Sequence, residues 1–115
     1  MSEISLTVTQ KRGDLVEGGF IIANKQIGYF FYYHRGSGVV SLDKFSLEAP
    51  LRLKGYGSLC YHQLEDHFRK EGFHRISLAA DSLGGKSSHG FWEKMGFKSH
   101  KEDRYLMEKE LQVSK

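Results

Sequence analysis

The chain of 115 residues has very few of the residues that cross-link or interrupt small proteins, with one cysteine, Cys60, and one proline, Pro50. A single cysteine cannot form an internal disulfide, which excludes a disulfide-rich secreted scaffold and favours a reducing, cytoplasmic location. The longest apolar stretch, Ile27–Tyr33, is far shorter than the roughly 20 residues that span a bilayer. The first residues also lack the basic and apolar regions of a signal peptide. We therefore expect a cytoplasmic protein without a membrane segment.

No repeat, low-complexity tract or linker divides the sequence, so residues 1–115 are expected to form a single domain. The formal net charge is +3, and it is distributed unevenly. Residues 1–50 carry five Lys/Arg and five Asp/Glu, whereas residues 51–115 carry twelve and nine, so the surplus of three lies entirely after Pro50. This surplus is either an ordinary solvated surface or a surface that meets an anion such as a phosphate.

Alternating apolar residues predict β-strands in the first half of the chain. We expect strands at Gly19–Ala23, Gln26–His34 and Val39–Leu47, and at Ile4–Thr9 either a short strand or an ordered arm. The aromatic residues of Tyr29–Tyr33 predict a strand that is covered on both faces. Strict alternation in the third strand would place Val39, Ser41, Asp43, Phe45 and Leu47 on one face.

The apolar period changes after Pro50 and predicts a helix over Gly57–Glu71 that ends before Gly72. Its apolar face carries Cys60, Tyr61, Leu64 and Phe68, and its far side carries Glu65, Asp66, Arg69 and Lys70. The remaining elements are a strand at Arg75–Ala80, a helix at Ser87–Met95, and a hairpin of Phe97–Lys101 with Arg104–Leu111. This order predicts an α/β (α+β) fold in which helices pack on a mixed sheet.

The segment between the third strand and the long helix carries the clearest chemical signal. Gly55 and Gly57 let the backbone approach a ligand closely at a helix N-terminus, where unpaired N–H groups and the helix dipole attract anions. Arg52 and Lys54 add two cations beside those amides. The segment matches neither a Walker A loop nor a dinucleotide-binding fingerprint. It predicts a pyrophosphate cradle, and the alternative is an ordinary glycine-capped turn.

Three motifs in this order resemble the GNAT superfamily of N-acetyltransferases. Arg52-Leu53-Lys54-Gly55-Tyr56-Gly57 fits the family's R/Q-x-x-G-x-G/A pyrophosphate loop, and Gly90–Phe97 is similar to its F-Y-E-K-L-G-F helix end. Arg104–Met107 with Leu111 is similar to the family's last strand, so the resemblance covers roughly residues 19–111. It implies a mostly antiparallel sheet and an acetyl-CoA-dependent transfer to a primary amine by direct attack.

The resemblance also implies which residues would bind acetyl-CoA. The end of the third strand would pair with the pantetheine arm, the backbone amides of Leu53–Ser58 would hold the pyrophosphate, and the helix Ser87–Met95 would flank the thioester. The backbone N–H of Leu47 would donate to the oxyanion. The implied cofactor-binding residues are Phe45, Ser46, Leu47, Arg52, Leu53, Lys54, Gly55, Tyr56, Gly57, Ser58, Ser87, Ser88 and Trp92.

Two positions depart from the family pattern. Serines at 87 and 88 stand where an asparagine is common, and Trp92 replaces the tyrosine often credited as general acid. An indole N–H can donate a hydrogen bond but cannot protonate a leaving thiolate. The candidate base is Asp43, with His34 and His89 as alternatives, and Tyr105 is a candidate to replace the missing hydroxyl. Cys60 is expected to be a buried core thiol.

The family's usual helices between the first strands are reduced or missing, because residues 10–18 are too short and too rich in Gly and Asp to form them. We therefore expect an open acceptor side, which favours an amine on a peptide or protein, or a pocket completed by a second copy in a homodimer. Two other functions remain open: a non-catalytic coenzyme A-binding module, suggested by Trp92, and a nucleic-acid-binding domain, suggested by a pI near 9.0. We expect no metal site, because the six histidines show no paired ligand spacing except His62 and His67, which are five residues apart and poorly placed on a helix. We also expect no nucleic-acid binding, since the positive surplus coincides with the phosphate loop.

Overall fold

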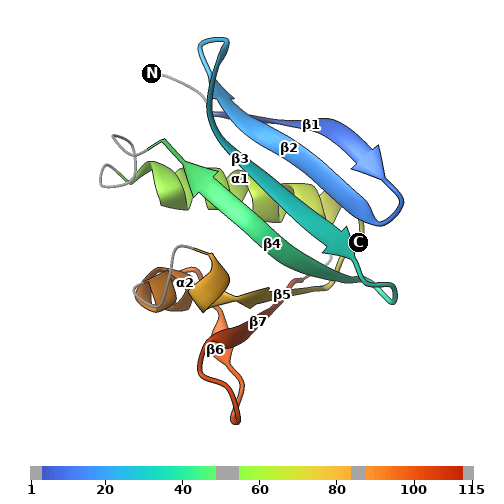
Figure 1. Cartoon of the computed structure of the whole chain (residues 1–115), viewed down its shortest axis with the longest axis vertical. Coiled ribbons are helices and arrows are strands. Elements are labelled where there is room, and N and C mark those ends of the chain that lie inside the picture. The colour runs from blue at the N-terminus through green and yellow to red at the C-terminus, as the bar shows by residue number, and fades with distance from the viewer. Residues whose placement is uncertain (1–3, 49–54, 84–87, 113–115) are drawn as a thin grey trace.

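The computed structural model describes residues 4–48, 55–83 and 88–112. Seven strands in these residues form one sheet in the order β1-β2-β3-β4-β5-β7-β6, shown in Figure 1. Every neighbouring pair is antiparallel except β4–β5, which is parallel. The prediction of a mixed, mostly antiparallel sheet with helices packed on it is thereby confirmed. The strands are β1 Ser5–Arg12, β2 Leu15–Ile22, β3 Lys25–His34, β4 Val39–Leu47, β5 Arg75–Ala79, β6 Lys98–Ser99 and β7 Leu106–Glu110, and the helices are α1 Tyr56–Lys70, the 3-10 turn η2 Ala80–Ser82 and α2 His89–Lys94.

The first two strands are longer than predicted. β1 continues to Arg12, and β2 begins at Leu15 instead of Gly19, so a hairpin connects them with no helix between. The pair Gly18–Gly19 lies inside β2 because a Cβ at Gly18 would overlap the ring of Phe30 and the carbonyl oxygen of Thr7. These glycines therefore permit close packing within the sheet and do not end a strand.

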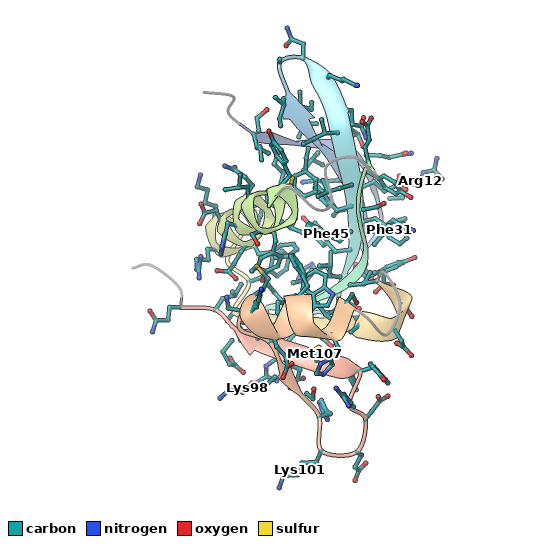
Figure 2. All side chains as sticks on the ribbon, turned by 90° about the vertical axis from the view of Figure 1, so that its left-hand side faces the viewer. Arg12, Phe31, Phe45, Lys98, Lys101 and Met107 are labelled. Carbon is teal, nitrogen blue, oxygen red and sulfur yellow. The ribbon has the colours of Figure 1, made fainter. Side chains whose placement is uncertain are left out.

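Both helices lie on the same face of the sheet. From α1, Phe68 packs edge-on against Tyr32 of β3, with ring centroids 4.8 Å apart. From α2, Trp92 packs edge-on against Phe45 of β4 at 5.5 Å. Figure 1 shows α1 running behind β3 and β4, and Figure 2 shows Phe45 on the helix side of the sheet with Phe31 on the other side.

The expectation that both faces of Tyr29–Tyr33 are covered is wrong. Phe30 and Tyr32 are 1% and 2% exposed, but Tyr29 on the opposite face is 44% exposed. On this open face the Lys44 ammonium lies 5.7 Å from the centroid of the Tyr29 ring. The aromatic strand is therefore amphipathic, with a core face and an open face.

The helix α1 follows its predicted pattern with one exception. Gly55 precedes it with a φ of 81° and Gly72 follows it with a φ of 88°, both in the left-handed region that favours glycine. Cys60, Leu64 and Phe68 are fully buried, as expected. Glu65, predicted on the solvent side, is only 4% exposed. A tyrosine and two cations pair with its carboxylate, which explains how a charge is tolerated there.

A β-bulge changes the faces of β4. Phe31 pairs with Lys44 while the next residue, Tyr32, pairs with Leu42, so Asp43 is the extra residue. The alternation restarts after the bulge, and Phe45 joins Val40 and Leu42 on the core side of the strand. The prediction that Asp43 shares a face with Phe45 is therefore wrong. The Asp43 carboxylate instead accepts a hydrogen bond of 2.8 Å from the Ser41 hydroxyl.

The C-terminal half has the predicted order with shorter elements. Ile76, Leu78 and Ala80 are buried, as the alternation of β5 predicts. The final hairpin is reduced to two residues in β6 and five in β7. None of the helices in the described ranges is long and apolar enough to cross a membrane.

Candidate functional site

A cavity of about 360 Å³ opens where β4 separates from β5. The two strands pair only from Val39 with Arg75 to Leu42 with Leu78. Beyond that point β4 continues to Leu47 while the chain of β5 turns into η2. The cavity lies between the end of β4, the start of α1 and the start of α2, and it is lined by Lys44, Phe45, Ser46, Leu47, Gly57, Ser82, Leu83, Ser88, Phe91 and Trp92.

The structure brings together six of the residues predicted to bind the cofactor. They come from three elements that are distant in sequence, and they are Phe45, Ser46, Leu47, Gly57, Ser88 and Trp92. Ser88 also fixes the start of α2, because its Oγ donates a 2.8 Å hydrogen bond to the carbonyl oxygen of Ala80, the first residue of η2. The assignment of the Leu47 amide as the oxyanion donor stays a prediction.

The N-terminus of α1 borders this cavity. Among the described residues no side chain caps the helix, and no acidic residue stands in its first turn, which favours an anion at the positive end of the helix dipole. A Cβ at Gly57 would lie 3.3 Å from Cε1 of Phe91, tight against the opposite wall. Gly55, Tyr56 and Ser58 lie in the same turn, whereas Arg52, Leu53, Lys54 and Ser87 lie outside the described residues. The residues present form a narrow slot that ends at a helix N-terminus.

Trp92 lies at the bottom of the cavity within an aromatic cluster. It is 1% exposed and packs edge-on against Phe45, Tyr61, Phe91 and Phe97 with centroid distances between 4.8 and 5.6 Å. Its Nε1 is buried and finds no hydrogen-bond partner among the described residues. The side chain therefore shapes the cavity as a rigid apolar base, and its N–H is enclosed by the core.

The candidate bases lie in different places. Asp43 does not line the cavity, but it occupies the bulge directly after Leu42, the last β4 residue paired with β5. His34 is at the opposite end of β3 from Leu47, whose partner is Gly28. His34 is thereby separated from the cavity by the length of the strand.

The rings of His89, the first residue of α2, and Tyr105 contact each other. The Nε2 of His89 is 2.9 Å from the Ser99 hydroxyl, and its ring lies edge-on to that of Tyr105 at 5.9 Å. Neither residue is among those that line the cavity. The structure therefore places the His89 side chain against β6 with the Tyr105 ring beside it, whereas Asp43 stands beside the opening between β4 and β5.

A buried carboxylate that the sequence analysis placed on the surface supports the cavity from behind. Glu65 accepts hydrogen bonds from the Tyr61 hydroxyl at 2.8 Å and the Lys109 ammonium at 2.6 Å, and pairs with Arg69 at 2.6 Å. Burial raises the pKa of Glu65, but the hydrogen bonds from Lys109 and Tyr61 and the two cations outweigh it, so the pKa is lowered overall. The spacing of Tyr61, Glu65 and Arg69 by four residues was the available signal.

This group, which we call the Glu65 cluster (Tyr61, Glu65, Arg69 and Lys109), connects three elements. Lys109 of β7 also donates a 2.7 Å hydrogen bond to the carbonyl oxygen of Met95, at the C-terminal end of α2. The Tyr61 ring packs against Trp92 at 5.6 Å and against Phe45 at 6.4 Å. The cluster therefore holds α1, α2 and β7 in the relative positions that define the cavity.

Cys60 is not part of the site. It is fully buried on α1, as predicted, and burial raises the pKa of its thiol to about 12. A thiol that stays protonated at neutral pH is a poor nucleophile. In the described ranges no group of three or more His, Cys, Asp or Glu residues is arranged to hold a metal ion.

Comparison with known proteins gives one sequence family and many similar folds. The profile of the acetyltransferase (GNAT) family matches residues 8–97, which is most of the chain. No curated protein sequence matches the chain significantly.

Solved structures of low sequence identity share the fold. GCN5 from Tetrahymena is 18% identical with a TM-score of 0.73, over 89% of this chain and 71% of that one. The PaiA N-acetyltransferase from Thermoplasma acidophilum, solved in complex with coenzyme A, is 20% identical with a TM-score of 0.68, over 85% and 62%. A domain from Methanocaldococcus jannaschii is 13% identical with a TM-score of 0.72, over 96% of this chain and 100% of its own.

Proposed function

Since this chain belongs to the acetyltransferase (GNAT) family of acetyl-CoA-dependent N-acetyltransferases, we propose that it transfers the acetyl group to a primary amine by direct attack. The observation that carries this proposal is the cavity where β4 leaves β5, which ends at the N-terminus of α1. Acetyl-CoA, when bound, supplies an activated acyl group with a thiolate as the leaving group.

The residues present fit a long, narrow ligand with an anionic portion. The slot beside Gly57 is narrow, because a Cβ at that position would press on the ring of Phe91. Phosphate oxygens at the first turn of α1 would receive backbone N–H groups and the positive end of the helix dipole. Phe45, Ser46 and Leu47 would flank the pantetheine arm along the edge of β4 that faces away from β3.

The proton of the incoming ammonium must be removed before attack, since only a neutral amine is nucleophilic. Asp43 is the proposed base, acting through water from its position in the bulge, and its hydrogen bond to Ser41 orients the carboxylate. Trp92 provides no hydroxyl group and its N–H is buried, so the leaving thiolate would take its proton from water. A coenzyme A thiolate leaves readily enough for this to slow the reaction without preventing it.

The acceptor side favours an amine carried on a peptide or protein. β1 and β2 are joined by a tight hairpin at Gly13–Asp14, with no helix to wall a pocket. The face of the sheet that carries Tyr29 is open to solvent. A pocket completed by a second copy of the chain is the other arrangement that such a surface allows.

A non-catalytic coenzyme A-binding module is the second candidate, favoured by Trp92 in the place of a tyrosine. One experiment separates the two functions. Acetyl-CoA is expected to raise the melting temperature in both cases, since a ligand that binds the native state stabilises it. Release of free thiol over a panel of peptide and small-molecule amines is expected only of an enzyme. Ligand stabilisation without thiol release from any amine would favour the binding module, and no stabilisation at all would contradict both.

A further inference from the structure

One side of α2 carries a histidine that lies between a serine hydroxyl and a carboxylate. The Nε2 of His89 is 2.9 Å from Oγ of Ser99 on β6, and its Nδ1 is 3.3 Å from Oε1 of Glu93. In Figure 2, Met107, the β7 residue paired with Ser99, lies next to α2. We call Ser99, His89 and Glu93 the Ser99 group. Other residues of α2, among them Trp92, line the cavity at the end of β4.

The two contacts of His89 assign the roles of its ring nitrogens. His89 and Glu93 are four residues apart on α2, so they occupy the same face of the helix. A proton on Nδ1 points at the Glu93 carboxylate, which leaves the lone pair of Nε2 to accept a hydrogen bond from the Ser99 hydroxyl. His89 is 7% exposed, and its ring packs edge-on against that of Tyr105. The imidazole is therefore held in one orientation toward the serine.

Ser99, in contrast to His89, is exposed to solvent. It belongs to β6, the last strand of the sheet, and it is among the residues that line a hollow of about 440 Å³ along β6 and β7. A small molecule can therefore reach the Ser99 hydroxyl while the histidine behind it stays shielded from water.

The edge position of β6 also directs a backbone donor outward. The N–H of His100 donates a 2.8 Å hydrogen bond to the carbonyl oxygen of Leu106, which makes these two residues a hydrogen-bonded pair of the antiparallel ladder. The next pair, Ser99 with Met107, is then a non-hydrogen-bonded pair, in which the backbone N–H groups point away from the opposite strand. The N–H of Ser99 therefore points off the edge of the sheet, where it can stabilise negative charge on an oxygen beside Oγ.

We propose that the Ser99 group is a second catalytic site, which hydrolyses small carboxylic esters. A serine hydroxyl within reach of a histidine that is oriented by a carboxylate is an activated nucleophile. Ser99 and His89 are the catalytic residues, whereas Glu93 is a positioning residue that acts through His89. The inference goes beyond the proposed function and does not depend on it, because the two sites use different residues.

The reaction needs only the ester and water. Oγ of Ser99 forms a bond to the acyl carbon while Nε2 of His89 takes the hydroxyl proton, and the N–H of Ser99 donates to the oxyanion. The carbon–oxygen bond to the alcohol breaks, and His89 gives its proton to the leaving oxygen. Water then attacks the acyl group on Ser99 and loses a proton to His89. The carboxylic acid leaves, and His89 returns that proton to Oγ.

The test follows the hydrolysis of p-nitrophenyl acetate by the full chain in the absence of coenzyme A. Ser99→Ala and His89→Gln are each expected to lower kcat by at least about 100-fold, with KM within about twofold. Glu93→Gln is expected to lower kcat by only about tenfold at unchanged KM, because its side chain is 61% exposed and water screens its charge. Ser5→Ala on β1 and His62→Gln on α1 remove an exposed residue of the same type, and these controls should hydrolyse the ester normally.

A second measurement identifies the nucleophile directly. A fluorophosphonate reacts with activated serine hydroxyls, and peptide mass spectrometry is expected to locate its adduct on Ser99 in the wild-type protein and in Ser5→Ala. The adduct is expected to be absent from His89→Gln. Because His89 is buried, the melting temperature of each variant is measured as well, and the exposed position of Ser99 keeps the test decisive if His89→Gln does not fold.

Three results would overturn the inference. They are ester hydrolysis that is unchanged in Ser99→Ala, a fluorophosphonate adduct on other residues only, and acetylation of surface lysines by p-nitrophenyl acetate without turnover. None of them bears on the proposed function, which is tested with acetyl-CoA and amines.

Discussion

The two halves of β4 belong to one continuous strand but have different surroundings. Val39–Leu42 lies between β3 and β5, and its inward side chains Val40 and Leu42 are 0% and 1% exposed. The second half has β3 on one edge only and lines the cavity with its other edge. The bulge at Asp43 separates the halves. One strand thus anchors the sheet at its start and offers a binding edge at its end, since the rigid half holds the open half in position.

The largest expected effect is a loss of stability in the paired half. Leu42→Ala should lower the free energy of unfolding by about 2–5 kcal/mol, because it leaves a cavity in the core. Ser46→Ala, in the open half, should change it by less than about 0.5 kcal/mol. Urea denaturation measures both. Similar losses in the two variants would contradict the division of β4 into a structural and a binding half.

The second-largest effect is expected from a substitution at the point where the binding edge of β4 meets α1. Gly57→Glu should weaken coenzyme A binding by at least about 100-fold, or about 2.7 kcal/mol, because the side chain would press on Phe91 and bring a negative charge to the helix N-terminus. Calorimetry measures this affinity. Gln63→Glu, which adds the same charge on the exposed side of α1, is the matched control and should bind normally. Binding retained by a folded Gly57→Glu protein would refute the cradle.

A smaller effect concerns the support behind the open half. Because the pKa of Glu65 is lowered in the folded protein, its ionised form stabilises the fold above the ordinary pKa of about 4.3, and this contribution is lost as the pH falls through the folded value. Glu65→Gln should lower the free energy of unfolding by about 1–3 kcal/mol at pH 7. In this variant the melting temperature should also fall less steeply as the pH is lowered. Wild-type and variant curves that stay parallel down to pH 3 would argue against the Glu65 cluster.

The smallest expected effect is on the chemical step at the junction of the two halves. Asp43→Asn should slow transfer by about tenfold at pH 6 and by less at pH 9, below the roughly 10²–10⁴-fold typical of a general base, because water also accepts the proton. The pH–rate profile of kcat/KM measures this. Ser41→Ala, which removes the hydrogen bond and keeps the carboxylate, is the control. An unchanged profile in Asp43→Asn would exclude Asp43 from the mechanism.

Local pattern was enough to predict the elements whose period is long and clearly bounded. The period of Cys60, Leu64 and Phe68 predicted α1, and glycines marked both of its ends. Ile76, Leu78 and Ala80 predicted β5 in the same way. The start of β2 could not be predicted, because Gly18 is required by the ring of Phe30 on the neighbouring strand and not by a turn. Pairing of this kind leaves no local signal.

The sequence by itself determined the fold class and the family, because these depend on local periodicity and on short motifs, and the same motifs predict which residues would meet the cofactor. It also determined that one cysteine forms no internal cross-link, and the structure places that residue in the core. Only the tertiary structure decided that Asp43 occupies a bulge, that Glu65 is buried and that His89 contacts Ser99. These three features depend on how strands and helices register against each other, and a period of two or of 3.6 contains no information about that register.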